Sequence, residues 1–90
     1  MRTIWKYPLK IIKWQEVELS LSAYALSAQF QSTVGLVLWA VIDPDARKEV
    51  RHIYLLGTGH VIEEERYETL VFIDTVQDFT NGLVWHVFIN

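Results

Sequence analysis

The segment Gly57-Thr58-Gly59-His60 has the residue types that bind a small anion. Its two glycines allow a turn in which backbone N–H groups converge, and the Thr58 hydroxyl and the His60 imidazole add further donors. A dinucleotide site or a P-loop needs a longer glycine pattern that leads into a helix, and no helix is predicted downstream. The segment is therefore a candidate site for a carboxylate or phosphate. The alternative interpretation is a tight turn or bulge without a ligand.

Other groups with chemical potential are scattered along the chain. The histidines His52, His60 and His86 lack the short spacing of a metalloprotease motif, so no metal site and no cofactor are predicted. No serine stands in the Gly-x-Ser-x-Gly turn of a hydrolase. Glu16 and Glu18 share one strand face, where solvated charge is the usual explanation. Because we find no catalytic constellation, we predict that the protein is not an enzyme.

The acidic segment Glu63-Glu64-Glu65 is the strongest charge cluster and a candidate partner-binding site. Such blocks usually form solvated loops, but they also steer basic protein surfaces toward a molecule. Trp14 lies between Lys13 and Gln15, outside the clear alternation of the residues that follow. Among the aromatic side chains, most of which we assign to the core, Trp14 is expected to be the most exposed and to anchor a partner.

Composition bounds the class of protein. The chain has 90 residues, of which 51% are hydrophobic, and this predicts one folded domain over residues 1–90. The net charge of -3 disfavours nucleic acid and anionic lipid as partners. The absence of cysteine removes disulfides and thiolate chemistry. Since neither a signal peptide nor an apolar run of membrane-spanning length is found, we expect a soluble cytoplasmic protein.

Almost every segment has the pattern of a β-strand. Residues 16–21 alternate between polar and apolar side chains, and residues 24–31 continue this alternation, although residues 23–29 also fit two helical turns. Further strands are expected at residues 3–9, 36–42, 49–56, 70–76 and 83–89. About six to seven short strands, with at most one short helix, predict an all-β fold that is a small antiparallel sandwich or barrel.

Individual residues indicate how these strands are arranged. Pro8 places the first strand at a sheet edge, and Gly35 and the Asn81-Gly82 pair indicate hairpin turns. The run Leu36–Ile42 is apolar without alternation, which predicts a strand buried on both faces. Such a strand is covered either by its own fold or by another subunit, so we expect a homo-oligomer.

Four segments carry a resemblance to a known family. They are Thr3–Leu9 (TIWKYPL), Leu38–Ala46 (LWAVIDPDA), Gly57–Ile62 (GTGHVI) and Gly82–Phe88 (GLVWHVF). In this order they resemble a family of small uncharacterised proteins encoded by bacteriophages and prophages. The resemblance implies a setting in the bacterial host cytoplasm, and it implies no activity and no site residues.

Two functional hypotheses follow. The first is a non-enzymatic, phage-type accessory protein that binds a host or defence protein and acts by occlusion, because the chain combines a small β scaffold with an acidic segment and many aromatics. The second is a protein that binds or sequesters a nucleotide or another small anion at Gly57–His60, with an aromatic ring stacked on the base.

Overall fold

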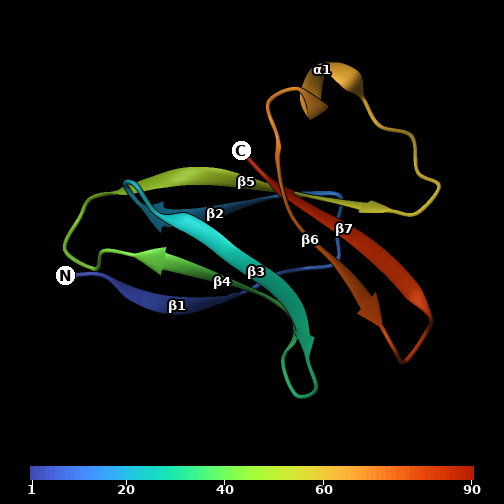
Figure 1. Ribbon diagram of the computed structural model, residues 1–90, viewed down its shortest axis with the longest axis horizontal. Coiled ribbons are helices and arrows are strands. Elements are labelled where there is room, and N and C mark those ends of the chain that lie inside the picture. Colours follow the sequence, from blue (N-terminus) through green and yellow to red (C-terminus); the bar gives the residue numbers. More distant parts are fainter.

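The computed structural model describes the backbone of residues 1–90 and all side chains except those of Glu64 and Arg66. Within these residues the chain forms seven strands and a single turn of helix (Figure 1). They are β1 (Thr3–Pro8), β2 (Trp14–Ser20), β3 (Tyr24–Gln31), β4 (Gly35–Ile42), β5 (Lys48–Gly57), α1 (Glu64–Tyr67), β6 (Val71–Asp78) and β7 (Leu83–Ile89). Among the described residues, no helix has the length and apolar composition that crossing a membrane requires.

The strands form two antiparallel sheets that stack as a sandwich. One sheet has the order β1-β4-β3 and the other the order β2-β5-β7-β6. Strands β3 and β6 lie side by side but belong to different sheets, so the structure is a sandwich and not a closed barrel (Figure 1). The predicted all-β fold is confirmed.

The core lies between the two sheets and is built from alternate residues of each strand. Leu38 of β4 and Ile53 and Val87 of the facing sheet have no exposed surface. The helical alternative for residues 23–29 is wrong, because this segment pairs with β4 and buries Ala28 completely. Burial of an inward-facing stripe in each strand is the main stabilising contribution, at about 25 cal/mol per Å² of apolar surface.

The turn residues have the conformations that the sequence predicts. Gly35 has φ of 100° at the first residue of β4, and Gly82 has φ of 73° between β6 and β7, both in the region that favours glycine. Pro8 is the last residue of β1, which lies at the edge of its sheet. A proline at this position costs no ladder hydrogen bond on the open side of the strand.

Asp78 fixes the turn between β6 and β7 and makes it sensitive to acid. Its Oδ1 accepts the Thr80 backbone N–H at 3.0 Å and the Thr80 hydroxyl at 2.6 Å. These hydrogen bonds, the hydroxyl first, lower the pKa of Asp78 below its ordinary value of 3.8. Because the pKa is lower in the folded state, the carboxylate stabilises the fold above the unfolded pKa, and this contribution is lost as pH falls through the folded pKa.

An NMR titration of the Asp78 carboxyl carbon is therefore expected to give a midpoint below 3.8. Thr80→Ala should move this midpoint upward, because the variant loses the hydroxyl donor. A midpoint that does not change in Thr80→Ala would show that the hydroxyl does not hold the carboxylate.

Strand β4 is buried differently on its two sides. Its inward residues belong to the core, whereas its outward residues are Val37, Trp39 and Val41. Val37 has no exposed surface, but Trp39 and Val41 remain half-buried. Within one chain, β4 is therefore buried on its core face. On its outer face only Val37 is buried, so the prediction of burial on both faces is met in part.

Candidate binding face

A row of aromatic side chains crosses the outer face of the four-stranded sheet. Trp14 on β2 pairs with Tyr54 on β5, Tyr54 pairs with Phe88 on β7, and Phe88 pairs with Phe72 on β6. Paired residues of antiparallel strands point to the same side of a sheet, so the four rings form one line across all four strands. We call these four residues the aromatic row.

The rings of the aromatic row contact one another edge to face. The ring centroids of Trp14 and Tyr54 are 5.3 Å apart, and those of Phe72 and Phe88 are 5.6 Å apart. Tyr67 of α1 adds a further edge contact to Phe88, also at 5.6 Å. These distances fall in the favourable range for aromatic pairs.

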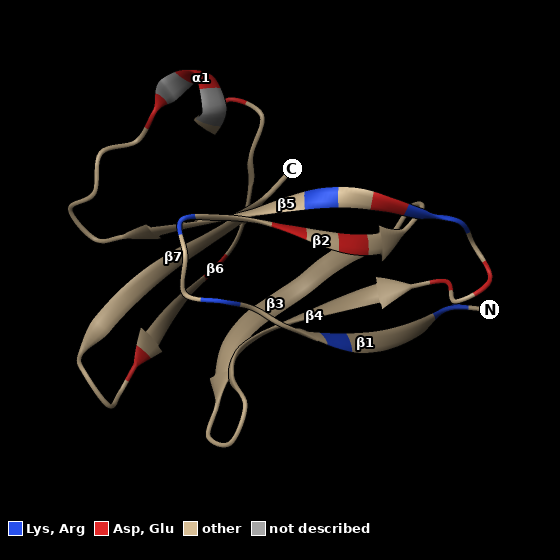
Figure 2. Cartoon of the chain, turned by 180° about the vertical axis from the view of Figure 1, so that it is seen from behind, with Lys and Arg blue, Asp and Glu red and all other residues tan. Residues whose placement is uncertain are grey.

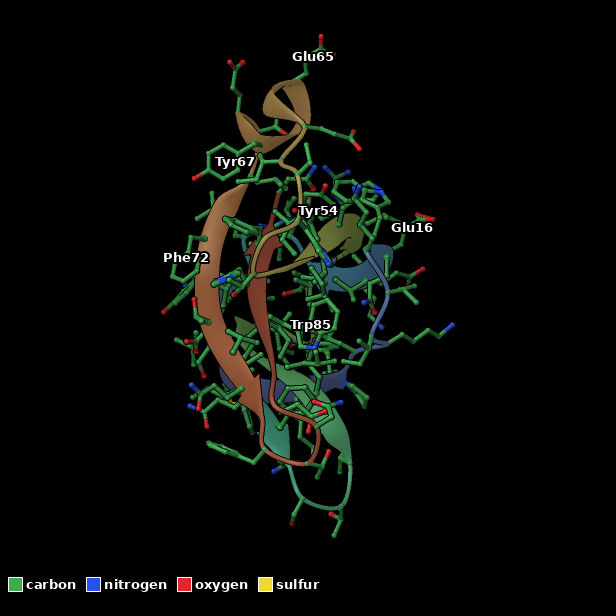
Figure 3. The ribbon with its side chains drawn as sticks, turned by 90° about the vertical axis from the view of Figure 1, so that its right-hand side faces the viewer. Glu16, Tyr54, Glu65, Tyr67, Phe72 and Trp85 are labelled. Atoms are coloured by element: carbon green, nitrogen blue, oxygen red, sulfur yellow. The ribbon has the colours of Figure 1, made fainter. Side chains whose placement is uncertain are left out.

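The centre of the row is buried and one end is open. Tyr54 and Phe88 are 0% and 7% exposed, whereas Phe72 is 55% exposed and Tyr67 is also exposed. Figure 3 shows Tyr67 and Phe72 one above the other on the same side of the molecule. An exposed aromatic pair that is continuous with a buried cluster is a preorganised apolar contact surface.

Trp14 is half-buried, and the prediction that it is the most exposed aromatic is wrong. Its ring stacks on His52 with centroids 5.0 Å apart, whereas Trp5 on β1 is 45% exposed. The reason is that Trp14 begins strand β2 and so starts the alternation that Glu16 and Glu18 continue on the same face. The sequence placed Trp14 outside this pattern.

The predicted acidic site lies beside the aromatic row. Glu63 Oε1 is 3.2 Å from Lys13 Nζ, which in turn lies 5.8 Å from the centroid of the Tyr54 ring. The hydrogen bond to Glu63 is the main cause of the raised pKa of Lys13. Glu65 is exposed and points away from the sandwich at α1 (Figure 3), and the side chain of Glu64 lies outside the described part of the chain.

The turn at Gly57–His60 uses part of its own donor set. The Gly57 N–H donates to His60 Nδ1 at 3.0 Å, and the His60 N–H donates to the Gly57 carbonyl oxygen at 3.0 Å. Both N–H groups are therefore already hydrogen-bonded within the turn, whereas the sequence suggested that they would be donors to a ligand. The His60 ring accepts one of these hydrogen bonds through Nδ1. Gly59, with φ of 91°, has the backbone conformation that requires glycine.

Sequence reasoning missed the hydrogen-bond chain around His86. Its Nε2 lies 2.9 Å from the Thr58 hydroxyl, and its Nδ1 lies 3.0 Å from the Thr75 hydroxyl. Thr75 and His86 are paired in the register of β6 and β7, which no local pattern reveals. Since both ring nitrogens bond to hydroxyls, the imidazole lacks the carboxylate that orients a catalytic histidine. These hydrogen bonds link the turn at Thr58 to strands β6 and β7.

A shallow hollow of about 330 Å³ lies beside this turn. It is lined by Gly57, Thr58, His60, Gly82, Leu83, Val84 and Trp85. Its size is at the lower end for small-ligand pockets. Among the described side chains, no three His, Asp or Glu residues gather closely enough to hold a metal ion.

Comparisons with known proteins identify a family without a known activity. A search of curated proteins and a search of solved structures each found no match. A family model described as a domain of unknown function, DUF7352, matches residues 1–90. The chain therefore belongs to the DUF7352 family of uncharacterised domains.

Proposed function

We propose that this chain is a non-enzymatic binding protein that holds a protein partner against the aromatic row. The observation that supports this proposal is the continuity of the exposed Phe72 and Tyr67 rings with the buried Tyr54 and Phe88 rings. Buried neighbours fix the exposed rings in place, so little side-chain entropy is lost on binding. Rigid aromatic anchors of this kind dominate the energy of protein interfaces.

The charges around the row favour a partner with a basic surface. Glu16 and Glu18 share the outer face of β2 with Trp14, Glu63 precedes α1, and Glu65 lies within α1 (Figure 2). Exposed carboxylates raise the rate of encounter with a positively charged surface. The resemblance to phage and prophage proteins is the reason for choosing a bacterial host or defence protein as the partner, with occlusion as the mode of action.

Phe72→Glu is expected to weaken partner binding by about 30-fold, because it removes an anchor ring and buries a charge. The wild-type protein first captures its partner from a bacterial lysate, and titration calorimetry then gives the affinity of the purified partner. Phe79→Glu is the matched control, because Phe79 is 89% exposed in the turn outside the row. Equal affinities of the two variants would contradict the proposal.

A reversal of charge tests the steering separately. Glu65→Lys should slow association and reduce its dependence on salt, while Glu49→Lys, an exposed residue at the start of β5, should change association less. Stopped-flow association rates at two ionic strengths distinguish the two variants. The same rate in both variants would show that the acidic segment does not steer the partner.

The second candidate function is binding of a small anion in the hollow beside Thr58. A phosphate or nucleotide that binds only the folded state raises the melting temperature. Thr58→Val keeps the side-chain shape and removes the hydroxyl, so it should abolish that rise. Gly59→Val is a poor test, because the φ of 91° strains a branched side chain with or without a ligand. A melting temperature that phosphate and nucleotides leave unchanged would exclude this function.

A further inference from the structure

The outer face of the three-stranded sheet is apolar and almost free of charge. By the register of its strands, three rows of side chains lie on this face: Ile4, Val41 and Tyr24; Lys6, Trp39 and Ser27; Pro8, Val37 and Gln29. Strands β3 and β4 contain no charged residue, and β1 contains only Lys6 (Figure 2). The face therefore differs from the outer face of the other sheet, which carries Glu16 and Glu18 on β2.

The apolar part of this face is exposed at one end. Ile4 is 56% and Tyr24 is 50% exposed, and the half-buried Val41 lies between them. At the other end, Lys6 Nζ donates to Gln31 Oε1 at 2.9 Å, across strand β4. This polar bridge accounts for the complete burial of Val37 and leaves Ile4, Trp39, Val41 and Tyr24 as the open patch.

The strand edges are less suited to association than this face. Both β3 and β6 carry a bulge, and the Asp74 carboxylate accepts the outward N–H of Ala28 on β3. Strand β2 carries Glu16 and Glu18, and β1 ends at Pro8. Bulges, charges and proline are the usual protections of a sheet edge. A contact between molecules is therefore expected through a face.

We propose that the occupant of this face is the same face of a second copy, related by a two-fold axis near Trp39 and Val41. The argument from charge is that the patch contains no carboxylate although the chain has a net charge of -3. A second copy presents the same neutral patch, so the contact buries apolar side chains and leaves Lys6 at the rim. Sheets that stack face to face lie about 10 Å apart.

The area of the face indicates a weak dimer. Three strands about 4.8 Å apart and about 25 Å long cover about 350 Å² per copy, or about 700 Å² for the pair. This area lies within the range of weak, reversible interfaces, which bury less than about 1,200 Å² in total. The dimer is therefore reversible and forms as concentration rises through the micromolar range.

Sedimentation velocity over about 1 to 300 µM tests this proposal. The wild-type protein should shift from monomer to dimer, and Ile4→Glu and Tyr24→Glu should each weaken the dimer at least about tenfold, because each charge occurs twice in a symmetric contact. Both side chains are half exposed, so both variants should keep the wild-type circular dichroism spectrum. Val61→Glu is the matched control, because Val61 is 81% exposed in the loop between β5 and α1, and this variant should dimerise normally.

Three results would overturn the proposal. A wild-type protein that remains monomeric at every concentration would show that the face has another occupant or none. A dimer that survives both Ile4→Glu and Tyr24→Glu would place the contact elsewhere. A dimer that Phe72→Glu dissolves and Ile4→Glu leaves intact would assign self-association to the aromatic row.

Discussion

Tyr54→Ala is expected to lower the free energy of unfolding by about 3–5 kcal/mol, the usual cost of removing a large buried aromatic side chain. Tyr54 has no exposed surface and lies in the middle of the aromatic row, with Trp14 on one side and Phe88 on the other. Its loss leaves a cavity that the neighbouring strands cannot close, because the backbone ladder fixes their spacing. Urea unfolding followed by tryptophan fluorescence measures the change.

Two control variants separate this effect from general damage. Tyr54→Phe keeps the ring and should cost less than about 1.5 kcal/mol. Phe79→Ala removes an aromatic ring that is 89% exposed and should change stability by no more than about 0.5 kcal/mol. Because small domains are stable by only about 5–15 kcal/mol, the alanine variant should be largely unfolded at moderate urea. A cost below about 1 kcal/mol would show that the row does not contribute to the fold.

Asp74→Ala is expected to cost about 1–3 kcal/mol, because it leaves a buried backbone N–H without its acceptor. Asp74 Oδ2 accepts the N–H of Ala28 across the seam between β3 and β6 at 3.4 Å. Ala28 has no exposed surface, so water cannot replace the carboxylate there. The second carboxylate oxygen accepts the Thr75 N–H at 2.9 Å, and Thr75 is exposed, so this bond is readily replaced by water.

Hydrogen exchange makes this prediction specific to one amide. The Ala28 amide should exchange faster in Asp74→Ala than in the wild type, beyond the change common to all core amides. Asp74→Asn keeps an acceptor oxygen and should restore most of the protection. If the Ala28 amide remains equally protected in Asp74→Ala, the carboxylate does not seal the seam.

The strands were predictable because alternation acts within a short stretch of chain. The pattern in residues 16–21 gave β2 to within two residues at its start, and Gly35 and Gly82 marked turns where φ is positive. The pattern of residues 24–31 was ambiguous with a helix only because small and polar residues fit both periods. Pairing with the apolar strand β4 resolves this ambiguity in favour of a strand.

The candidate site was much less predictable, because it depends on which strands are neighbours. Alternation shows which residues share one face of one strand, but it contains no information on sheet order. Trp14, Tyr54, Phe72 and Phe88 come from four strands that are separated along the chain and meet only through the order β2-β5-β7-β6. The contact between Thr75 and His86 has the same origin.

The stacking of two sheets places the aromatic row and the apolar outer face of the three-stranded sheet on opposite sides of one thin molecule, whose shortest extent is 16 Å. A dimer formed back to back through the apolar face would therefore carry two aromatic rows that point in opposite directions. Such a particle is bivalent, and it would bridge two partner molecules or two sites of one large assembly. Its avidity would then depend on protein concentration, since only the dimer can hold both sites.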